Sequence, residues 1–481
     1  MRTMRIGIVA LILAGLVMPL AALAQQPPLS TPPTAPPSAP PFSAERARAV
    51  DEMARAEIHS GSTPGVAIGI VQDGLLVYAR GFGFASLRPR RAVTPSTEFY
   101  AGSLGKQFTA ACVLLLEQQK KLSLDDKVTK YVPELSVAKN VTLRELLQQT
   151  SGLPRARNAA GVSRDLTRPV KIEDLIKSAN AMPLEFAPGT QFDDNNLNYL
   201  LAGLIVQRVS GLPLSIFYST QIFAPLIMTS SFLAGDQGIS SAHAAGYSRE
   251  RGKFTRVRPW DASWLFGSSD LVTTVQDLAK WDIGLPLLLD VDSIRDMWTP
   301  SGLQGTVPYG MGWVVDQRGG QRYVWQNGQI AGYHAMNAML PDEHLAVIVL
   351  TNADSLNGAT TVQPERLANR ILDVISPLPP AHFGNLITTR ATEWLGRLAR
   401  IDVDRTQLTT AFSQYLSDQV VHRADVASLG PVLSLVPFES YQRSGDTVYV
   451  FDVKFRRGAY RFNFALAPDG KIDGLFLQPY G

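Results

Sequence analysis

Strand-forming segments lie on both sides of a long helical stretch, and this order constrains the fold more than any other feature of the chain. Residues 66–71 and 75–78 are apolar and are joined by Gln72-Asp73-Gly74, which predicts a β-hairpin. Strand-like segments return at 324–326 and 345–350. Between them, three segments space their apolar residues as helices do: 106–119, 143–149 and 198–209. We therefore expect an α+β fold whose sheet joins the two ends of the domain.

Composition limits the classes of partner and cofactor. The chain has 481 residues, 45% of them hydrophobic, which suffices for one large domain and one smaller one. The net charge is only +3 and no basic stripe is present, so we expect no nucleic-acid partner. The single cysteine, Cys112, lies in an apolar run and reads as a small buried hydrophobe. The six histidines lack metal-site spacing, and we expect neither a metal nor another cofactor.

The first residues predict export. Arg2 and Arg5 precede an apolar stretch that ends in Ala22-Leu23-Ala24, so residues 1–24 read as a signal peptide cleaved before Gln25. The alternative is an uncleaved membrane anchor, because the stretch approaches spanning length. Under the first interpretation, the mature protein has no stable membrane span and is periplasmic or secreted.

Proline marks the expected boundaries along the rest of the chain. Eight prolines make residues 25–42 an extended linker, and Ser376-Pro377-Leu378-Pro379-Pro380 opens a second linker over 376–382. The main domain should therefore span 43–375. Residues 383–481 should form a small α+β domain, with helices at 391–399 and 407–416 and strands at 448–455, 460–466 and 472–478.

Ser103-Leu104-Gly105-Lys106 is the strongest chemical motif. It stands where a polar segment leads into an apolar helix, and residues three apart on a helix share a face. Lys106 is therefore expected to reach the Ser103 hydroxyl, and a desolvated lysine can act as the base that a serine nucleophile needs. Alone, the tetrapeptide fits an N-capping serine beside a solvated lysine better than a catalytic pair, because short motifs are weak evidence.

The segments around this motif carry a family resemblance. They include 94–99, 122–128, 141–147, 149–154, 188–192, 309–313 and 350–352. In this order and spacing, residues 45–375 resemble the class C β-lactamase-related serine hydrolases, which are penicillin-binding-protein-like enzymes. That family includes β-lactamases, D-alanyl-D-alanine carboxypeptidases, D-aminopeptidases and esterases. The resemblance implies the β-lactamase/transpeptidase-like fold, with an antiparallel sheet flanked by helices and an all-helical subregion.

The resemblance also implies two further site elements, and both depart from the family pattern. Where the family has Y-x-N, the flanking residues align Asp194-Asn195-Asn196, so Asn196 is kept and Asp194 replaces tyrosine. A shift by one would instead align Asp193-Asp194-Asn195. Where the family has K-T-G or H-x-G, this chain has Gln326-Asn327-Gly328, and the next residue, Gln329, should supply one oxyanion-hole N–H with Ser103 supplying the other.

These departures leave the activity open. Asp194 could accept the Ser103 proton, since a carboxylate is a legitimate general base, or it could only form an ion pair with Lys106 and weaken the site. The resemblance implies an exported bacterial serine hydrolase acting through a Ser103 acyl-enzyme on a small ester or a D-amino-acid peptide, with Asn196 and Gln326 holding the substrate. Gln326 lacks the charge that attracts a substrate carboxylate, so β-lactamase action is less expected. The alternatives are a degenerate member that binds cell-wall peptide (peptidoglycan) or another ligand without turnover, and a tethered module whose C-terminal part does the binding.

Overall fold

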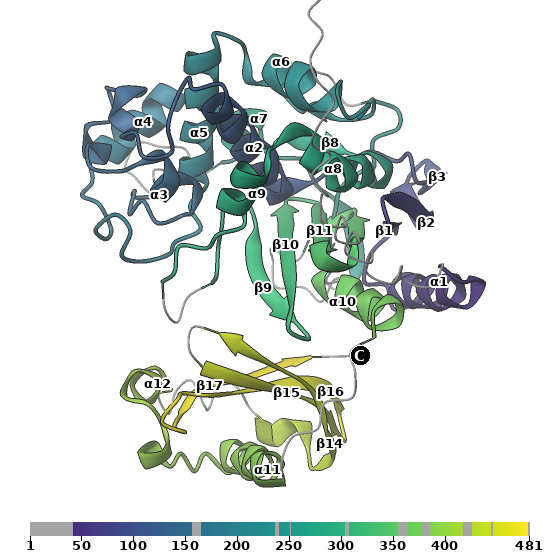
Figure 1. Ribbon diagram of the computed structural model, residues 1–481. Helices are drawn as coiled ribbons and strands as arrows, with labels where there is room; N and C mark the ends of the chain where they lie inside the picture. Colours follow the sequence, from purple (N-terminus) through teal and green to yellow (C-terminus); the bar gives the residue numbers. More distant parts are fainter. Residues whose placement is uncertain are drawn as a thin grey trace, which may run out of the picture. The chain divides into compact units, whose positions relative to one another are not determined.

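The computed structural model describes residues 42–155, 165–235, 240–250, 252–303, 307–354, 364–377, 385–416, 426–443 and 446–479 (Figure 1). The expected signal peptide lies outside these residues, as do residues 25–41 of the first linker and 378–382 of the second.

One antiparallel sheet of seven strands forms the centre of the main domain, in the order β3-β2-β1-β12-β11-β10-β9 (Figure 1). Its strands are β1 (Gly65–Gln72), β2 (Leu75–Leu87), β3 (Arg90–Ala92), β9 (Val314–Arg318), β10 (Gln321–Ile330), β11 (Tyr333–Leu340) and β12 (Leu345–Thr351). β1 pairs with β12 from Val66 opposite Thr351 to Gln72 opposite Leu345. The expected hairpin and the expected joining of the two chain ends are therefore confirmed, and so is the α+β fold.

Both faces of this sheet are covered, which explains why every residue of β1 and β12 is buried and most are apolar. On β1, Val66, Ile68 and Ile70 pack in one core, while Ala67 and Val71 pack in the other, as the alternation of a strand requires. The first core also contains apolar residues of the helices α1 (Ala44–His59) and α10 (Pro364–Ile375). The second contains those of α2 (Gly105–Gln118) and α8 (Val275–Leu288).

The helices between β4 (Phe99–Tyr100) and β9 form the expected helical subregion. They are α2, α3 (Leu143–Leu147), α4 (Ile172–Asn180), α5 (Asn196–Ser210), α6 (Leu214–Tyr218), α7 (Ala262–Leu265), α8 and α9 (Val291–Met297). Two small sheets accompany them: β4 (Phe99–Tyr100), β8 (Leu271–Thr273) and β5 (Phe232–Leu233), and then β13 (Ala353–Asp354), β6 (Tyr247–Glu250) and β7 (Lys253–Arg256). Among the described residues no single helix has the length and hydropathy of a membrane span, although α5 with the segment Leu214–Phe223 passes as a pair bent by 78°.

The C-terminal part has a core of its own and contains α11 (Asn385–Arg400) and α12 (Thr410–Tyr415). Its sheet has the order β14-β15-β16-β17, with bounds Val432–Arg443, Asp446–Phe455, Gly458–Leu466 and Ile472–Pro479. Three of these strands were expected and β14 was not. β14 contains Pro437 next to a bulge, which an edge strand tolerates and which hides the strand from a pattern search.

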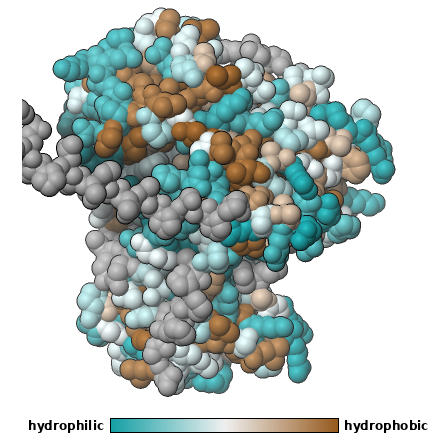
Figure 2. All heavy atoms as spheres, turned by 45° about the vertical axis from the view of Figure 1, so that its right-hand side comes forward, coloured by the Kyte–Doolittle hydropathy of each residue, from teal (hydrophilic) through white to brown (hydrophobic). Residues whose placement is uncertain are grey.

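Apolar residues remain exposed at single positions, among them Leu75, Leu287 and Val291. Figure 2 shows one face of the molecule, on which hydrophobic residues form separate patches between hydrophilic ones. Scattered exposure of this kind is normal for a folded protein and identifies no partner.

Candidate active site

Ser103 lies in a tight turn that packs directly against β10. It belongs to a single 3₁₀ turn, Gly102–Leu104, that leads into α2. A Cβ atom on Gly102, whose φ is +56°, would stand 2.7 Å from the backbone nitrogen of Gln329. A Cβ atom on Gly328 would stand 1.9 Å from the carbonyl oxygen of Ala101. Two glycines are therefore required for the contact between this turn and β10.

The pairing of the sheet explains why this contact is possible. β9 pairs with β10 only from Gln321 to Trp325, so residues 326–330 have that edge open. The Ser103 turn lies against this edge, and the position of a Cβ on Gly328 is 2.9 Å from the backbone nitrogen of Ser103. The backbone nitrogens of Ser103 and Gln329 thus both lie at the contact, as the sequence predicts for a pair of oxyanion-hole donors.

Lys106 lies beneath the serine and is 0% exposed. Its Nζ atom forms a short ion pair with Asp194, which is 88 residues later in the chain, and lies 5.7 Å from the centre of the Tyr199 ring. Among the described residues, Lys106 Nζ forms its hydrogen bond with Asp194 and forms none with Ser103. The ammonium has three N–H donors, so the bond to Asp194 leaves two of them, and the expectation that Lys106 can reach Ser103 stays a prediction.

Asp194 is 54% exposed at its side chain and faces a cavity. Partial burial raises the pKa of its carboxyl, but the charge and hydrogen bond of Lys106, with a smaller contribution from Arg155, outweigh this effect and leave the pKa below its ordinary value. At neutral pH the group is a carboxylate.

Gln149 organises the segment that carries Asp194, and sequence reasoning gave it no role. Its Nε2 donates to Asp194 Oδ1 at 2.7 Å. Its Oε1 accepts from the backbone nitrogen of Asn195 at 3.2 Å and from Asn198 Nδ2 at 2.5 Å. A positive φ of 60° places this side chain, and the only signal in the sequence was its position in a segment that resembles the family.

Asn196, the first residue of α5, is exposed to the cavity, whereas the Asn195 side chain is used locally. Asn195 Oδ1 caps the helix by accepting from the nitrogen of Leu197, and its Nδ2 donates to the carbonyl oxygen of Leu153. This division favours the alignment with Asn196, rather than Asn195, as the residue free to meet a substrate.

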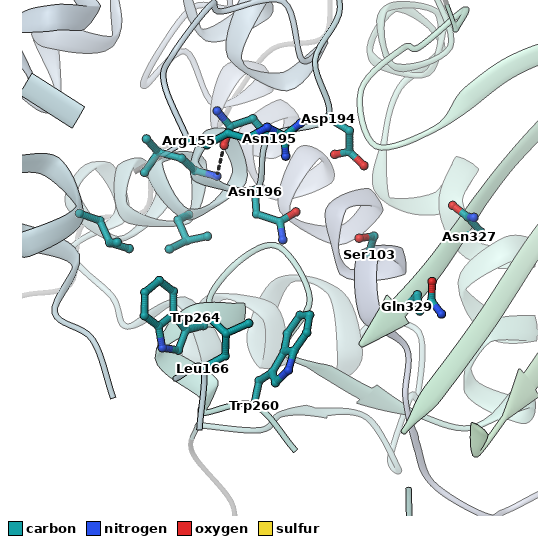
Figure 3. Close-up of a pocket in the computed structure, with 13 residues that line it drawn as sticks. Ser103, Arg155, Leu166, Asp194, Asn195, Asn196, Trp260, Trp264, Asn327 and Gln329 are labelled. Carbon is teal, nitrogen blue, oxygen red and sulfur yellow. Dashed lines mark hydrogen bonds between the residues drawn. The ribbon is translucent and has the colours of Figure 1, made fainter. Parts of the chain in front are cut away.

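The cavity beside Ser103 has a volume of about 330 Å³, within the range of small-molecule sites. Figure 3 shows Ser103, Asp194, Asn196, Asn327 and Gln329 around it. The opposite wall is apolar and consists of Leu166, Leu175, Leu197, Leu200, Trp260 and Trp264. Two of these leucines, Leu166 and Leu175, come from the segment between Arg155 and α5. One part of the cavity can therefore hold a polar reacting group while another holds an apolar substituent.

Gln326 does not occupy the place expected for a substrate-holding residue. It is 4% exposed and is not among the described residues that line the cavity. Its Nε2 donates to the carbonyl oxygen of Asn327 at 2.8 Å. Because side chains alternate along a strand, the cavity wall here is formed by Asn327 and Gln329 instead. Within the described residues no cluster of three or more His, Cys, Asp or Glu side chains could hold a metal ion.

Comparison with known proteins decides the family. The model of the Beta-lactamase family matches residues 50–370, which is more than half of the chain. The chain belongs to the Beta-lactamase family. The resemblance stated from the sequence is thereby confirmed.

Solved structures of this family share the fold. The octameric penicillin-binding protein homologue from Pyrococcus abyssi has a TM-score of 0.61 at 20% identity, covering 89% of this chain and 94% of that one. D-amino acid amidase from Ochrobactrum anthropi SV3, solved with D-phenylalanine, has a TM-score of 0.61 at 22% identity, covering 69% and 99%. At these identities the likeness shows the β-lactamase/transpeptidase-like fold alone.

Two relatives in sequence are similar over part of their length. Protein flp of Staphylococcus aureus strain N315 is 25% identical over 317 residues, which cover 64% of this chain and 63% of that protein. Unguisins hydrolase ungD' of Aspergillus campestris is 26% identical over 356 residues, covering 67% and 65%. The chain thus spans less than two thirds of the length of these relatives.

Proposed function

We propose that this protein is an exported serine hydrolase that cleaves a small amide or ester of a D-amino acid through an acyl-enzyme on Ser103. The observation that carries the proposal is the joint position of Ser103, the pair of buried Lys106 with Asp194, and the backbone nitrogens of Ser103 and Gln329 beside one cavity. A nucleophile, a proton-handling pair and oxyanion donors are the three parts that acyl transfer needs.

In the proposed reaction, Ser103 Oγ attacks the carbonyl carbon of the substrate and transfers its proton to the Lys106–Asp194 pair. The carbonyl oxygen becomes the oxyanion and is held by the nitrogens of Ser103 and Gln329. Collapse of this intermediate breaks the bond to the amine or alcohol, which leaves with the proton. Water then attacks the acyl-enzyme by the same steps, releasing the acid and restoring Ser103.

The apolar wall favours a substrate with an aromatic or branched side chain, because Trp260, Trp264 and the four leucines offer an apolar surface against which it can pack. The amidase relative, whose structure contains D-phenylalanine, supports the choice of a D-amino acid. If residues 1–24 direct export, peptidoglycan, with its D-amino acids, is a candidate source of substrate. N-terminal sequencing of the periplasmic protein should find Gln25 first; an intact Met1 there would contradict export by cleavage.

The test is hydrolysis of the p-nitroanilides and p-nitrophenyl esters of D- and L-phenylalanine and of D- and L-alanine, with Ser103→Ala as the control. We expect turnover that requires Ser103 and favours the D-phenylalanine compounds. Turnover that survives in Ser103→Ala would remove Ser103 as the nucleophile, and a preference for L compounds would overturn the substrate class.

One observation favours a second function, ligand binding without turnover. Lys106 gives its hydrogen bond to Asp194 and not to Ser103, so within the described residues the serine hydroxyl has no base in contact. A binding protein of this kind would bind the same compounds with all substrates left intact after prolonged incubation.

A further inference from the structure

The orientation of the Asn327 carboxamide is fixed by a group outside the cavity. Asn327 lines the cavity, and its Nδ2 donates to Glu365 Oε1 at 2.6 Å. Only the NH₂ end of an amide can donate to a carboxylate, so the carbonyl end must face the other way. In Figure 3 the oxygen of Asn327 lies on the side of Ser103 and the nitrogen on the far side.

Glu365 is itself held in place from a second side. It lies in the first turn of α10, and its Oε1 is 2.9 Å from Nε2 of His334, which is 3% exposed. His334 stands opposite Gln329 in the pairing of β10 with β11. Burial raises the pKa of the Glu365 carboxyl, but the hydrogen bonds from His334 and Asn327 outweigh this effect and leave the pKa below its ordinary value. The group is therefore an ionised acceptor with two donors. This arrangement leaves Asn327 one orientation.

The polar side of the cavity therefore presents two fixed side-chain acceptors, beside the carboxamides of Asn196 and Gln329 that also line it. Asn327 Oδ1 is one, and the half-exposed carboxylate of Asp194 is another. Arg155 is the cation on the described part of the wall, and its guanidinium is already paired with Asp193. A substrate carboxylate placed there would meet oxygen atoms, whereas an ammonium or N–H group would be bound.

The position suits a group close to the scissile bond. Asn327 immediately precedes Gly328, which touches the Ser103 turn. In an amino-acid amide the α-ammonium is attached to the carbon next to the carbonyl carbon, so its partner must stand near the nucleophile. An acceptor at Asn327 meets this requirement.

We propose that Asn327 is a specificity-determining residue that accepts a hydrogen bond from the free α-ammonium group of an amino-acid amide or ester, and that Glu365 is its positioning residue. The proposal rests on the function proposed above for the same cavity. Asn327 would distinguish substrates by the charge at their amino end, whereas the apolar wall does not respond to that charge.

Binding in the Ser103→Ala background tests this without depending on turnover. The probes are D-phenylalaninamide, its N-acetyl form, which lacks the charge, and its N-succinyl form, which carries a carboxylate. Affinities are measured by intrinsic fluorescence, because Trp260 and Trp264 line the cavity. We expect the free amine to bind more tightly than the N-succinyl form by roughly 10- to 100-fold, the worth of a charge-assisted hydrogen bond.

Three further changes in the same background distinguish positioning from simple structural support. Asn327→Leu removes the acceptor and Glu365→Met frees the carboxamide to turn, so both should reduce the preference to within a few-fold. Glu365→Gln keeps an oxygen that accepts from Asn327 and His334 and should retain the preference. Melting temperatures show whether each variant is folded.

Two results would overturn the proposal: an unchanged preference in folded Asn327→Leu and Glu365→Met, or N-succinyl binding as tight as the free amine in the parent. Failure of the proposed function gives a different signature, since the ammonium preference would be present in the binding assay while the wild-type chain hydrolyses none of these compounds.

Discussion

Asp282 is a buried acid whose replacement by asparagine should stabilise the protein. It lies on α8, is 6% exposed, and its Oδ1 accepts from Nδ2 of Asn337 at 2.7 Å. Asp282 Oδ2 and Asn337 Oδ1 are buried without a partner among the described residues. Burial raises the pKa of Asp282 from 3.8 to about 8, with the hydrogen bond from Asn337 opposing it. At neutral pH the carboxyl therefore holds a proton that can bond to Asn337 Oδ1.

The sign and size of the effect follow from this pKa. Between pH 4 and pH 8 the folded chain keeps a proton that the unfolded chain has released, so the free energy of unfolding falls as pH rises, by about 1.4 kcal/mol per pH unit. The stabilisation is fully present below the unfolded pKa and is lost by the folded pKa near 8. The free energy of unfolding of the wild type should therefore be lower at pH 7 than below pH 4 by on the order of 4 kcal/mol.

Asp282→Asn removes this loss without changing shape. An asparagine accepts from Asn337 Nδ2 as before, and its own NH₂ donates to Asn337 Oδ1, so both partnerless atoms are satisfied. The melting temperature of the variant should equal that of the wild type below the unfolded pKa of 3.8 and exceed it increasingly up to pH 8, by roughly 5–10 °C. Differential scanning fluorimetry over this range measures it.

Asp290→Asn is the matched control, because Asp290 is the exposed N-cap of α9 and its pKa is lowered by its hydrogen bonds to Ser293. It should show no gain at any pH. A constant difference between Asp282→Asn and wild type, or a variant less stable at pH 8, would refute the reasoning about a buried protonated carboxyl.

Further changes test the site. Asp194→Asn should lower Ser103-dependent hydrolysis on the order of 10²–10⁴-fold in a steady-state assay, since an amide does not accept the serine proton as a base; unchanged activity would leave Lys106 as the sole base. Gly328→Ala should lower both the melting temperature and the labelling of the serine by a fluorophosphonate, because the new Cβ would meet Ala101 O at 1.9 Å; normal labelling would contradict the contact. Trp260→Ala should raise KM for phenylalanine substrates roughly ten-fold and leave alanine substrates unaffected, and equal effects on both would remove Trp260 from recognition of the apolar group.

Periodicity and turn signals predicted much of the fold, and the failures have physical causes. The hairpin of β1 and β2 and the helix α2 follow from local patterns that the structure keeps. β11 was missed because the buried polar residues His334 and Asn337 interrupt its apolar run, whereas β1 and β12 have long apolar runs. β14 was missed because of Pro437 on an edge strand.

The candidate site divides in the same way. The order of the motifs predicted that Ser103, Lys106 and Asp194 belong to one site. In the structure Ser103 and Asp194 line one cavity, and Lys106 is buried beneath it. The contact of Asn327 with Glu365 could not be foreseen, because it joins a strand to a helix 38 residues later through the packing of the sheet. Gln326 was chosen from its place in the motif, and only the alternation of β10 shows that it turns away from the cavity.

The most direct test of the account is the mass of the intact protein after exposure to a labelled penicillin, a fluorophosphonate and an activated D-phenylalanine ester. We predict one covalent adduct per chain from the fluorophosphonate and a transient one from the ester, both mapped by peptide sequencing to Ser103 and both absent in a folded Ser103→Ala variant. An adduct on another residue, or none with any of the three reagents, would contradict the claim that Ser103 is a nucleophile.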